Sequence, residues 1–101
     1  MDLAKIDTVE NEEESRFELN VDSFVAFVQY KIGKSGHWYL VHTEVPEQVK
    51  SLGVGNKLVR ETLNLLEAKG VKIVPTCPFV RAFMKRHEED YRQLLAPGVT
   101  L

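Results

Sequence analysis

The spacing of apolar residues changes once along this chain, at Pro46, and that change limits the folds open to it. Before Pro46, apolar and polar residues alternate with a period of two, which is typical of β-strands with one buried face. After Pro46, apolar residues recur every three or four positions, which is typical of amphipathic helices. The pattern therefore predicts an antiparallel β-meander followed by helices.

The alternating part predicts strands over residues 16–20, 24–32 and 38–45, joined by short polar turns. A leading segment, residues 5–9, is expected to form a further short strand. The acidic run over residues 10–14 then serves as the turn between this strand and the next. The alternative, which the residues leave open, is that the run is a frayed acidic arm.

The second part predicts a helix that begins near Val54 and ends at Gly70, followed by a short strand over residues 71–76. Because a strand–helix–strand unit of this length forms a right-handed crossover, this strand should lie parallel to the strand over residues 38–45. Pro78 begins a second helix, and polar residues 88–90 are expected to interrupt it before a last helical turn. The predicted fold class is α+β: about four antiparallel strands, a right-handed βαβ unit and a C-terminal helix.

Composition supports one domain over residues 1–101, since a chain of this length with 44% hydrophobic residues can bury a core without disulfides or a structural metal. A formal net charge of -2 argues against a general nucleic-acid binder. One cysteine, Cys77, cannot form an internal disulfide, which indicates a reducing compartment. There is no apolar run of the ~18–20 residues that a membrane span needs, and no secretory segment, so we expect a soluble cytoplasmic protein.

A Gly-x-Gly, Gly53-Val54-Gly55, lies where the strand over residues 38–45 gives way to the first helix. A helix N-terminus presents unpaired N–H groups and partial positive charge, and glycines let a phosphate approach them. Lys50 and Lys57 would add positive charge. The segment matches neither the P-loop nor the dinucleotide fingerprint. From these residues alone, a phosphate cradle and a glycine-tolerant helix start both remain open.

In this context Lys50-Ser51-Leu52-Gly53-Val54-Gly55 resembles the acetyl-CoA loop, Gln/Arg-x-x-Gly-x-Gly/Ala, of the GNAT superfamily of N-acetyltransferases. Residues 42–46 (His-Thr-Glu-Val-Pro) and 73–80 (Ile-Val-Pro-Thr-Cys-Pro-Phe-Val) are similar to the short single-domain GNAT-like proteins of the YjdJ type. The likeness spans about residues 17–91. Lys50 replaces the usual Gln or Arg and keeps a charged donor, whereas Ser51 stands where those proteins often carry glycine.

The resemblance implies an acetyl-CoA-dependent transfer of an acetyl group to a primary amine. It places CoA between the strands over residues 38–45 and 71–76, which would splay apart, with the pantetheine arm along residues 43–45 and the pyrophosphate on the N–H groups of residues 52–57. The residues thereby expected to bind the cofactor are Thr43, Glu44, Val45, Lys50, Ser51, Leu52, Gly53, Val54, Gly55, Asn56, Lys57, Cys77, Phe79, Lys85 and Arg86. For Lys85 and Arg86 the alternative is a structural role at the end of the second helix, and for Phe79 it is the core.

Three residues are candidates for catalysis: Cys77, His42 and Glu44. Cys77 follows a strand and precedes Pro78, and a helix N-terminus there would favour the thiolate; it either accepts the acetyl group or lines the site, and the alternative is a small buried hydrophobe. His42 and Glu44 are expected to continue the strand face of Leu40. They would either open into the active cleft and take a proton from the amine, or emerge into solvent.

Three functions compete: an N-acetyltransferase, a CoA or acyl-CoA binding module with little or no transfer, and a structural α+β protein. The expected partners of the first are acetyl-CoA and an amine acceptor, either a small molecule or a protein lysine. No metal, nucleic acid or membrane is expected. The acceptor and the oligomeric state cannot be read from the residues.

Overall fold

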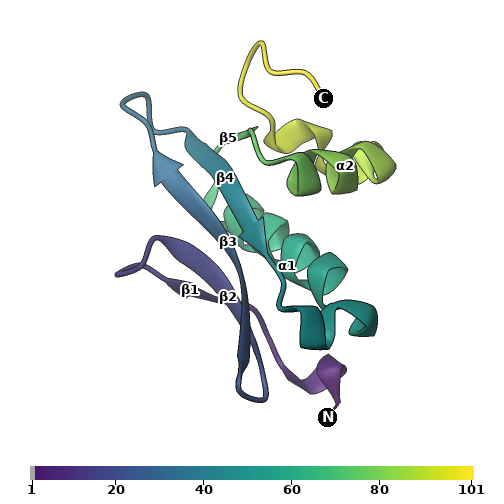
Figure 1. Ribbon diagram of the computed structural model, residues 1–101. Helices are drawn as coiled ribbons and strands as arrows, with labels where there is room; N and C mark the ends of the chain where they lie inside the picture. Colours follow the sequence, from purple (N-terminus) through teal and green to yellow (C-terminus); the bar gives the residue numbers. More distant parts are fainter. Residues whose placement is uncertain (1) are drawn as a thin grey trace.

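The computed structural model describes residues 2–101 and contains one five-stranded mixed sheet in the order β1-β2-β3-β4-β5 (Figure 1). The strands are β1 (Val9–Asn11), β2 (Arg16–Val21), β3 (Phe24–Ile32), β4 (Trp38–Glu44) and β5 (Ile73–Pro75). Strands β1 to β4 form an antiparallel meander, and β5 pairs parallel to β4. The predicted α+β fold class, a meander followed by a βαβ unit and C-terminal helix, is confirmed.

Helix α1 (Val54–Lys69) connects the parallel strands β4 and β5, and α2 (Pro78–Arg86) follows β5. Shorter helical segments are η1 (Leu3–Lys5), η2 (Glu47–Leu52), α3 (Glu88–Tyr91) and η3 (Arg92–Leu94). Helix α1 packs on β2 and β3, while α2 packs beside β4 and β5 and against α1. None of the helices formed by residues 2–101 combines the length and the apolar character that crossing a membrane requires.

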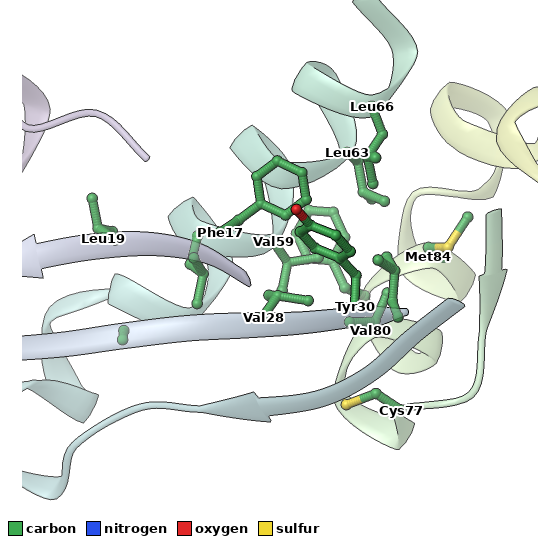
Figure 2. Close-up of a cluster of buried hydrophobic side chains, with 14 of the residues drawn as sticks. Phe17, Leu19, Val28, Tyr30, Val59, Leu63, Leu66, Cys77, Val80 and Met84 are labelled. Carbon is green, nitrogen blue, oxygen red and sulfur yellow. The ribbon is translucent and has the colours of Figure 1, made fainter. Parts of the chain in front are cut away.

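The core lies between one face of the sheet and the two longer helices (Figure 2). Phe17 of β2 and Val28 of β3 are fully buried against Val59 and Leu63 of α1. Successive side chains of a strand point to opposite faces. The neighbours of these buried residues along each strand, such as Phe27 beside Val28, therefore face away from the helices. Within residues 2–101 the sheet therefore has one packed face and one open face.

The pairing of β3 with β4 contains a β-bulge. Tyr30 lies opposite Leu40 and Gln29 lies opposite His42, so Val41 is an extra residue in β4. A bulge interrupts the alternation of side chains, because the inserted residue shifts everything after it by one position. Before the bulge the even-numbered residues of β4 face the helices, and after it the odd-numbered residues do.

This bulge makes one sequence-based prediction wrong. His42 and Glu44 were expected on the strand face of Trp38 and Leu40, but Trp38 and Leu40 are buried whereas His42 and Glu44 are exposed on the open face. Thr43 instead lies opposite the buried Val28 and is half-buried on the packed face. The prediction from strict alternation failed because it assumes that every residue of the strand is paired, whereas Val41 is an extra residue.

The N-terminal strand lies further along the chain than predicted. Residues 9–11 form β1, and the turn to β2 begins after Asn11, so the acidic run is divided between strand and turn. Glu10 is tolerated in β1 because its carboxylate accepts a hydrogen bond from Tyr30 Oη (2.6 Å) and pairs with Lys69 Nζ (3.0 Å). Burial, reinforced by the Glu10 carboxylate, raises the pKa of Tyr30 above its usual range. The frayed-arm alternative is therefore also wrong.

The C-terminal helical region breaks at His87, not at residues 88–90, which form α3. Tyr91 is buried with its ring 6.0 Å from that of Phe83, and its hydroxyl donates to Asn64 Oδ1 at 3.0 Å. Docking Tyr91 on α1 and α2 draws the preceding acidic residues into a helical turn. Acidic side chains are favourable in the first turn of a helix, where the dipole is positive.

The N-terminal segment is attached to α1 through Glu61. Thr8 donates from its backbone N and its Oγ1 to Glu61 Oε1, both at 2.9 Å, and Lys57 Nζ donates to Glu61 Oε2 at 2.9 Å. Burial by itself raises the pKa of Glu61, but the hydrogen bonds from Lys57 and Thr8 outweigh it and hold the pKa below its ordinary value.

We expect Glu61→Gln to lower the free energy of unfolding at neutral pH by about 1–2 kcal/mol, because hydrogen bonds to a charged acceptor are stronger than those to an amide. Because folding lowers the pKa of Glu61, its contribution is present above the ordinary carboxyl pKa and is lost as pH falls through the lowered value. Urea titrations at several pH values should thus show the gap between the two proteins closing in acid. Glu13→Gln, an exposed control in the β1–β2 turn, should show no gap; a Glu61→Gln gap independent of pH would contradict this account.

Candidate functional site

Strands β4 and β5 part at Leu40. Their pairing runs from Trp38 opposite Ile73 to Leu40 opposite Pro75. There the Leu40 carbonyl accepts hydrogen bonds from the backbone N–H groups of Thr76 and Cys77, both at 3.0 Å. Pro75 has no N–H to extend the ladder. In the part of the chain that the structure describes, β4 continues for four residues with its β5-facing edge unpaired.

A cleft of about 500 Å³ opens beside this free edge, a volume within the range of small-molecule sites. The end of β4, the segment η2 and helix α2 form its walls, and the start of α1 forms its floor. The residues that line it are Thr43, Glu44, Val45, Lys50, Gly53, Gly55, Asn56, Phe79 and Arg86.

The floor of the cleft contains the N-terminus of α1. Gly53, with φ of +79°, ends η2 and caps α1 at once, a left-handed conformation that side chains disfavour. The first intrahelical bond runs from Lys57 N to Gly53 O, so the N–H groups before Lys57 lack helical acceptors. Within residues 2–101 no side chain caps this end of the helix. These donors and the helix dipole make the floor suited to an anion.

Gly55 is the point where the first turn of α1 comes close to helix α2 and to Val45, the residue after β4. A Cβ at this position would lie 2.7 Å from Phe79 Cζ and 3.5 Å from Val45 Cγ2. Any larger residue would thus collide with the Phe79 ring, which leaves 42% of its surface exposed over the cleft. The bare backbone of Gly55 lets the first turn of α1 approach both β4 and α2.

Two cationic side chains line the cleft, Lys50 and Arg86. Lys50 Nζ pairs with Glu47 at 3.1 Å in an exposed contact, and Arg86 Nη2 donates to Asn56 Oδ1 at 3.4 Å. Both contacts are weak enough for an anion to replace, since exposed pairs contribute little. The positive charge of the cleft therefore comes from two elements on either side of the α1 N-terminus.

The remaining residues expected at the cofactor lie outside the lining of the cleft. Val54 is fully buried in the core, Leu52 is exposed, and Lys57 is engaged by Glu61. The others outside the lining are Ser51, Cys77 and Lys85. Which side chains of the motif turn into the cleft depends on the orientation of the helix.

Cys77 is the N-cap residue of α2, with Pro78 in the first turn. Its side chain is 5% exposed and belongs to the core cluster, and Sγ donates to Thr43 Oγ1 at 3.3 Å. Thr43 in turn lines the cleft. The thiol therefore lies one residue behind the cleft wall.

His42 and Glu44 form an exposed pair, with His42 Nε2 3.4 Å from Glu44 Oε2. Glu44 lines the cleft, whereas the His42 ring lies on the open face, 6.0 Å from the ring of Phe27. Of the three catalytic candidates, Glu44 alone lines the cleft, although it shares the open face of β4 with His42, and Cys77 lies behind the cleft wall.

Two features of the site were not predicted from the sequence. The first is the bulge at Val41, where the sequence has no glycine or proline that would indicate it. The place of the Thr43 side chain, between the cleft and Cys77, is the second, because it depends on this bulge. Among residues 2–101, no cluster of three or more His, Cys, Asp or Glu side chains is arranged to hold a metal ion.

Comparison with known families adds one finding. A family model described as GCN5-related N-acetyl-transferase matches residues 16–94. The match runs from β2 to η3 and includes every residue that lines the cleft, together with Cys77. It identifies the family and does not single out the YjdJ type. The fold agrees with this match, since it has the meander, the parted strands β4 and β5 and the glycine start of α1. Because the family model matches most of the chain, the chain belongs to the family of GCN5-related N-acetyltransferases.

Proposed function

We propose that this protein transfers the acetyl group of acetyl-CoA to a primary amine in the cleft between β4, α1 and α2. The observation that carries the proposal is the meeting of the unpaired β4 edge with the uncapped N-terminus of α1 in one cleft of about 500 Å³. Membership of an N-acetyltransferase family supports the reaction class. The identity of the acyl donor and the amine acceptor is our inference.

The cleft offers acetyl-CoA two kinds of contact. Its pyrophosphate would rest on the N–H groups around Gly55 and Asn56, where the helix dipole and the cations of Lys50 and Arg86 favour negative charge. Its pantetheine amides would pair with the free backbone of β4 near Thr43, as an added strand does. Phe79 supplies an apolar surface between these two regions.

In the reaction, the neutral amine nitrogen attacks the thioester carbonyl carbon, and a tetrahedral oxyanion forms. As it collapses, the C–S bond breaks, the nitrogen loses its proton, and the CoA thiolate leaves and takes up a proton. Glu44 carries the carboxylate among the residues that line the cleft, and this carboxylate can receive the proton of the amine. Cys77 either gives its proton to the leaving thiolate or accepts the acetyl group before the amine does.

A second function, binding of CoA or an acyl-CoA with little transfer, is favoured by one observation. Cys77 is 5% exposed and lies behind Thr43, and His42 faces away from the cleft, so two of the three catalytic candidates do not reach it directly. A purified protein that binds acetyl-CoA but acetylates no member of a panel of small amines and lysine peptides would support this second function.

We expect acetyl-CoA at a hundredfold excess over its Kd to raise the free energy of unfolding by about 2.7 kcal/mol, because the ligand binds the folded state alone. In a protein of this size that shifts Tm by more than about 10 °C. Pantetheine, which lacks the pyrophosphate, should give a smaller shift at the same concentration. A melting curve unchanged by millimolar acetyl-CoA and by millimolar CoA would contradict the assignment of the cleft.

We expect Gly55→Ala to weaken acetyl-CoA binding at least tenfold, about 1.4 kcal/mol, because a methyl group would stand between the α1 backbone and the phosphate. The same methyl would collide with Phe79, so Phe79→Ala and the double variant are the matched controls. Calorimetry should show the double variant binding as weakly as Gly55→Ala. Recovery to the affinity of Phe79→Ala would mean that the methyl acts only by displacing the ring.

We expect Cys77→Ser to leave acetyl-CoA affinity nearly unchanged and to slow acetyl transfer more than a hundredfold, about 2.7 kcal/mol in the barrier. The affinity is retained because the thiol does not line the cleft. Rates measured under single-turnover conditions, with mass spectrometry for an acetyl adduct on Cys77, separate acceptance of the acetyl group from proton donation. A loss below fivefold would remove Cys77 from the reaction.

A further inference from the structure

Thr43 is the residue that joins the cleft to the Cys77 thiol. It lines the cleft, and its Oγ1 accepts a hydrogen bond from Cys77 Sγ at 3.3 Å. The bulge at Val41 puts it there, since without the inserted residue position 43 would face the open side of the sheet. Any molecule in the cleft therefore meets the Thr43 hydroxyl before it meets the sulfur.

The other hydrogen bonds of Cys77 involve its backbone and not its sulfur. Its N–H donates to the Leu40 carbonyl at 3.0 Å, and its carbonyl accepts from Arg81 N at 3.0 Å in the first turn of α2. The Arg81 guanidinium is directed to the carbonyls of Pro75 and Thr100. Among the described residues, Sγ makes its hydrogen bond with the Thr43 hydroxyl.

We propose that Thr43 is a positioning residue whose hydroxyl holds the Cys77 sulfur in place behind the cleft wall and stabilises it when it loses its proton. This proposal rests on the proposed function. It assigns to the Thr43 side chain a role separate from the backbone pairing of β4 with pantetheine.

A hydroxyl can serve both protonation states of the sulfur because it has one donor and two acceptor positions. In the resting protein the S–H group donates to Oγ1. When the S–H proton passes to the leaving CoA thiolate, the sulfur becomes an anion and an acceptor. The Thr43 O–H then rotates and donates to it, with no other change in the pair.

The test is the rate at which iodoacetamide alkylates Cys77 at neutral pH without any CoA, followed by mass spectrometry in Thr43→Val and Thr43→Ser. Valine keeps the shape and removes the hydroxyl, so we expect alkylation at least about tenfold slower, as for the loss of one hydrogen bond to a charged group. Serine keeps the hydroxyl and should restore the rate to within about threefold. Thr43→Ala repeats the deletion if valine is not tolerated.

A matched control exists in α1. Thr62 is fully buried, and its Oγ1 has no hydrogen-bond partner within the described residues, so Thr62→Val makes the same chemical change without breaking a bond. It should alkylate like the unchanged protein. Alkylation of Thr43→Val at the unchanged rate, or of Thr43→Ser as slowly as Thr43→Val, would overturn the proposal.

The alkylation series needs no cofactor, so it distinguishes failure of this proposal from failure of the proposed function. If acetyl transfer is present, Thr43→Val should lower kcat while the KM for acetyl-CoA changes little, and Thr43→Ser should rescue kcat. If transfer is absent but valine slows alkylation and serine restores it, the Thr43–Cys77 coupling stands and the transferase assignment falls.

Discussion

The carbonyl of Leu40 is the point on which the functional end of this protein depends. It accepts the N–H groups of Thr76 and Cys77 together, and the Thr76 hydroxyl at 3.2 Å as well, so β5 cannot continue along β4. The chain turns there into α2, and the rest of β4 keeps a free edge. This one carbonyl thus marks the place where the cleft opens, where α2 begins after Cys77 and where the free edge of β4 starts.

The bulge at Val41 gives this free edge its chemistry. By shifting the alternation of β4 one position, it turns Thr43 towards Cys77 and the packed face, and turns His42 to the open face. In a strand without the bulge, His42 would face the packed side of the sheet instead. The arrangement of the catalytic candidates is therefore a consequence of backbone geometry, with Glu44 at the cleft and the sulfur reached through a hydroxyl.

The cationic side chains near the cleft fall into two groups: one is held in a structural ion pair, and the others make only exposed contacts. Lys57 looks from its position like a phosphate contact, yet Glu61 holds it together with Thr8, where it attaches the N-terminal segment to α1. Lys50 and Arg86 make only weaker, exposed contacts and remain at the cleft. The ion pair around Glu61 stabilises the helix whose N-terminus the ligand would use.

The sequence by itself determined the order of the elements, because this order rests on local spacing: alternation before Pro46 and helical periodicity from Val54. The glycines at the helix start indicate the region that we propose as the site. Shifts at the ends of the chain came from long-range contacts such as those of Tyr91, which no local pattern records. Only the tertiary structure decided which side chains of β4 enter the cleft. The reason is that a bulge such as that at Val41 arises from pairing between strands, and the pairing of Thr43 with Cys77 joins residues 34 positions apart.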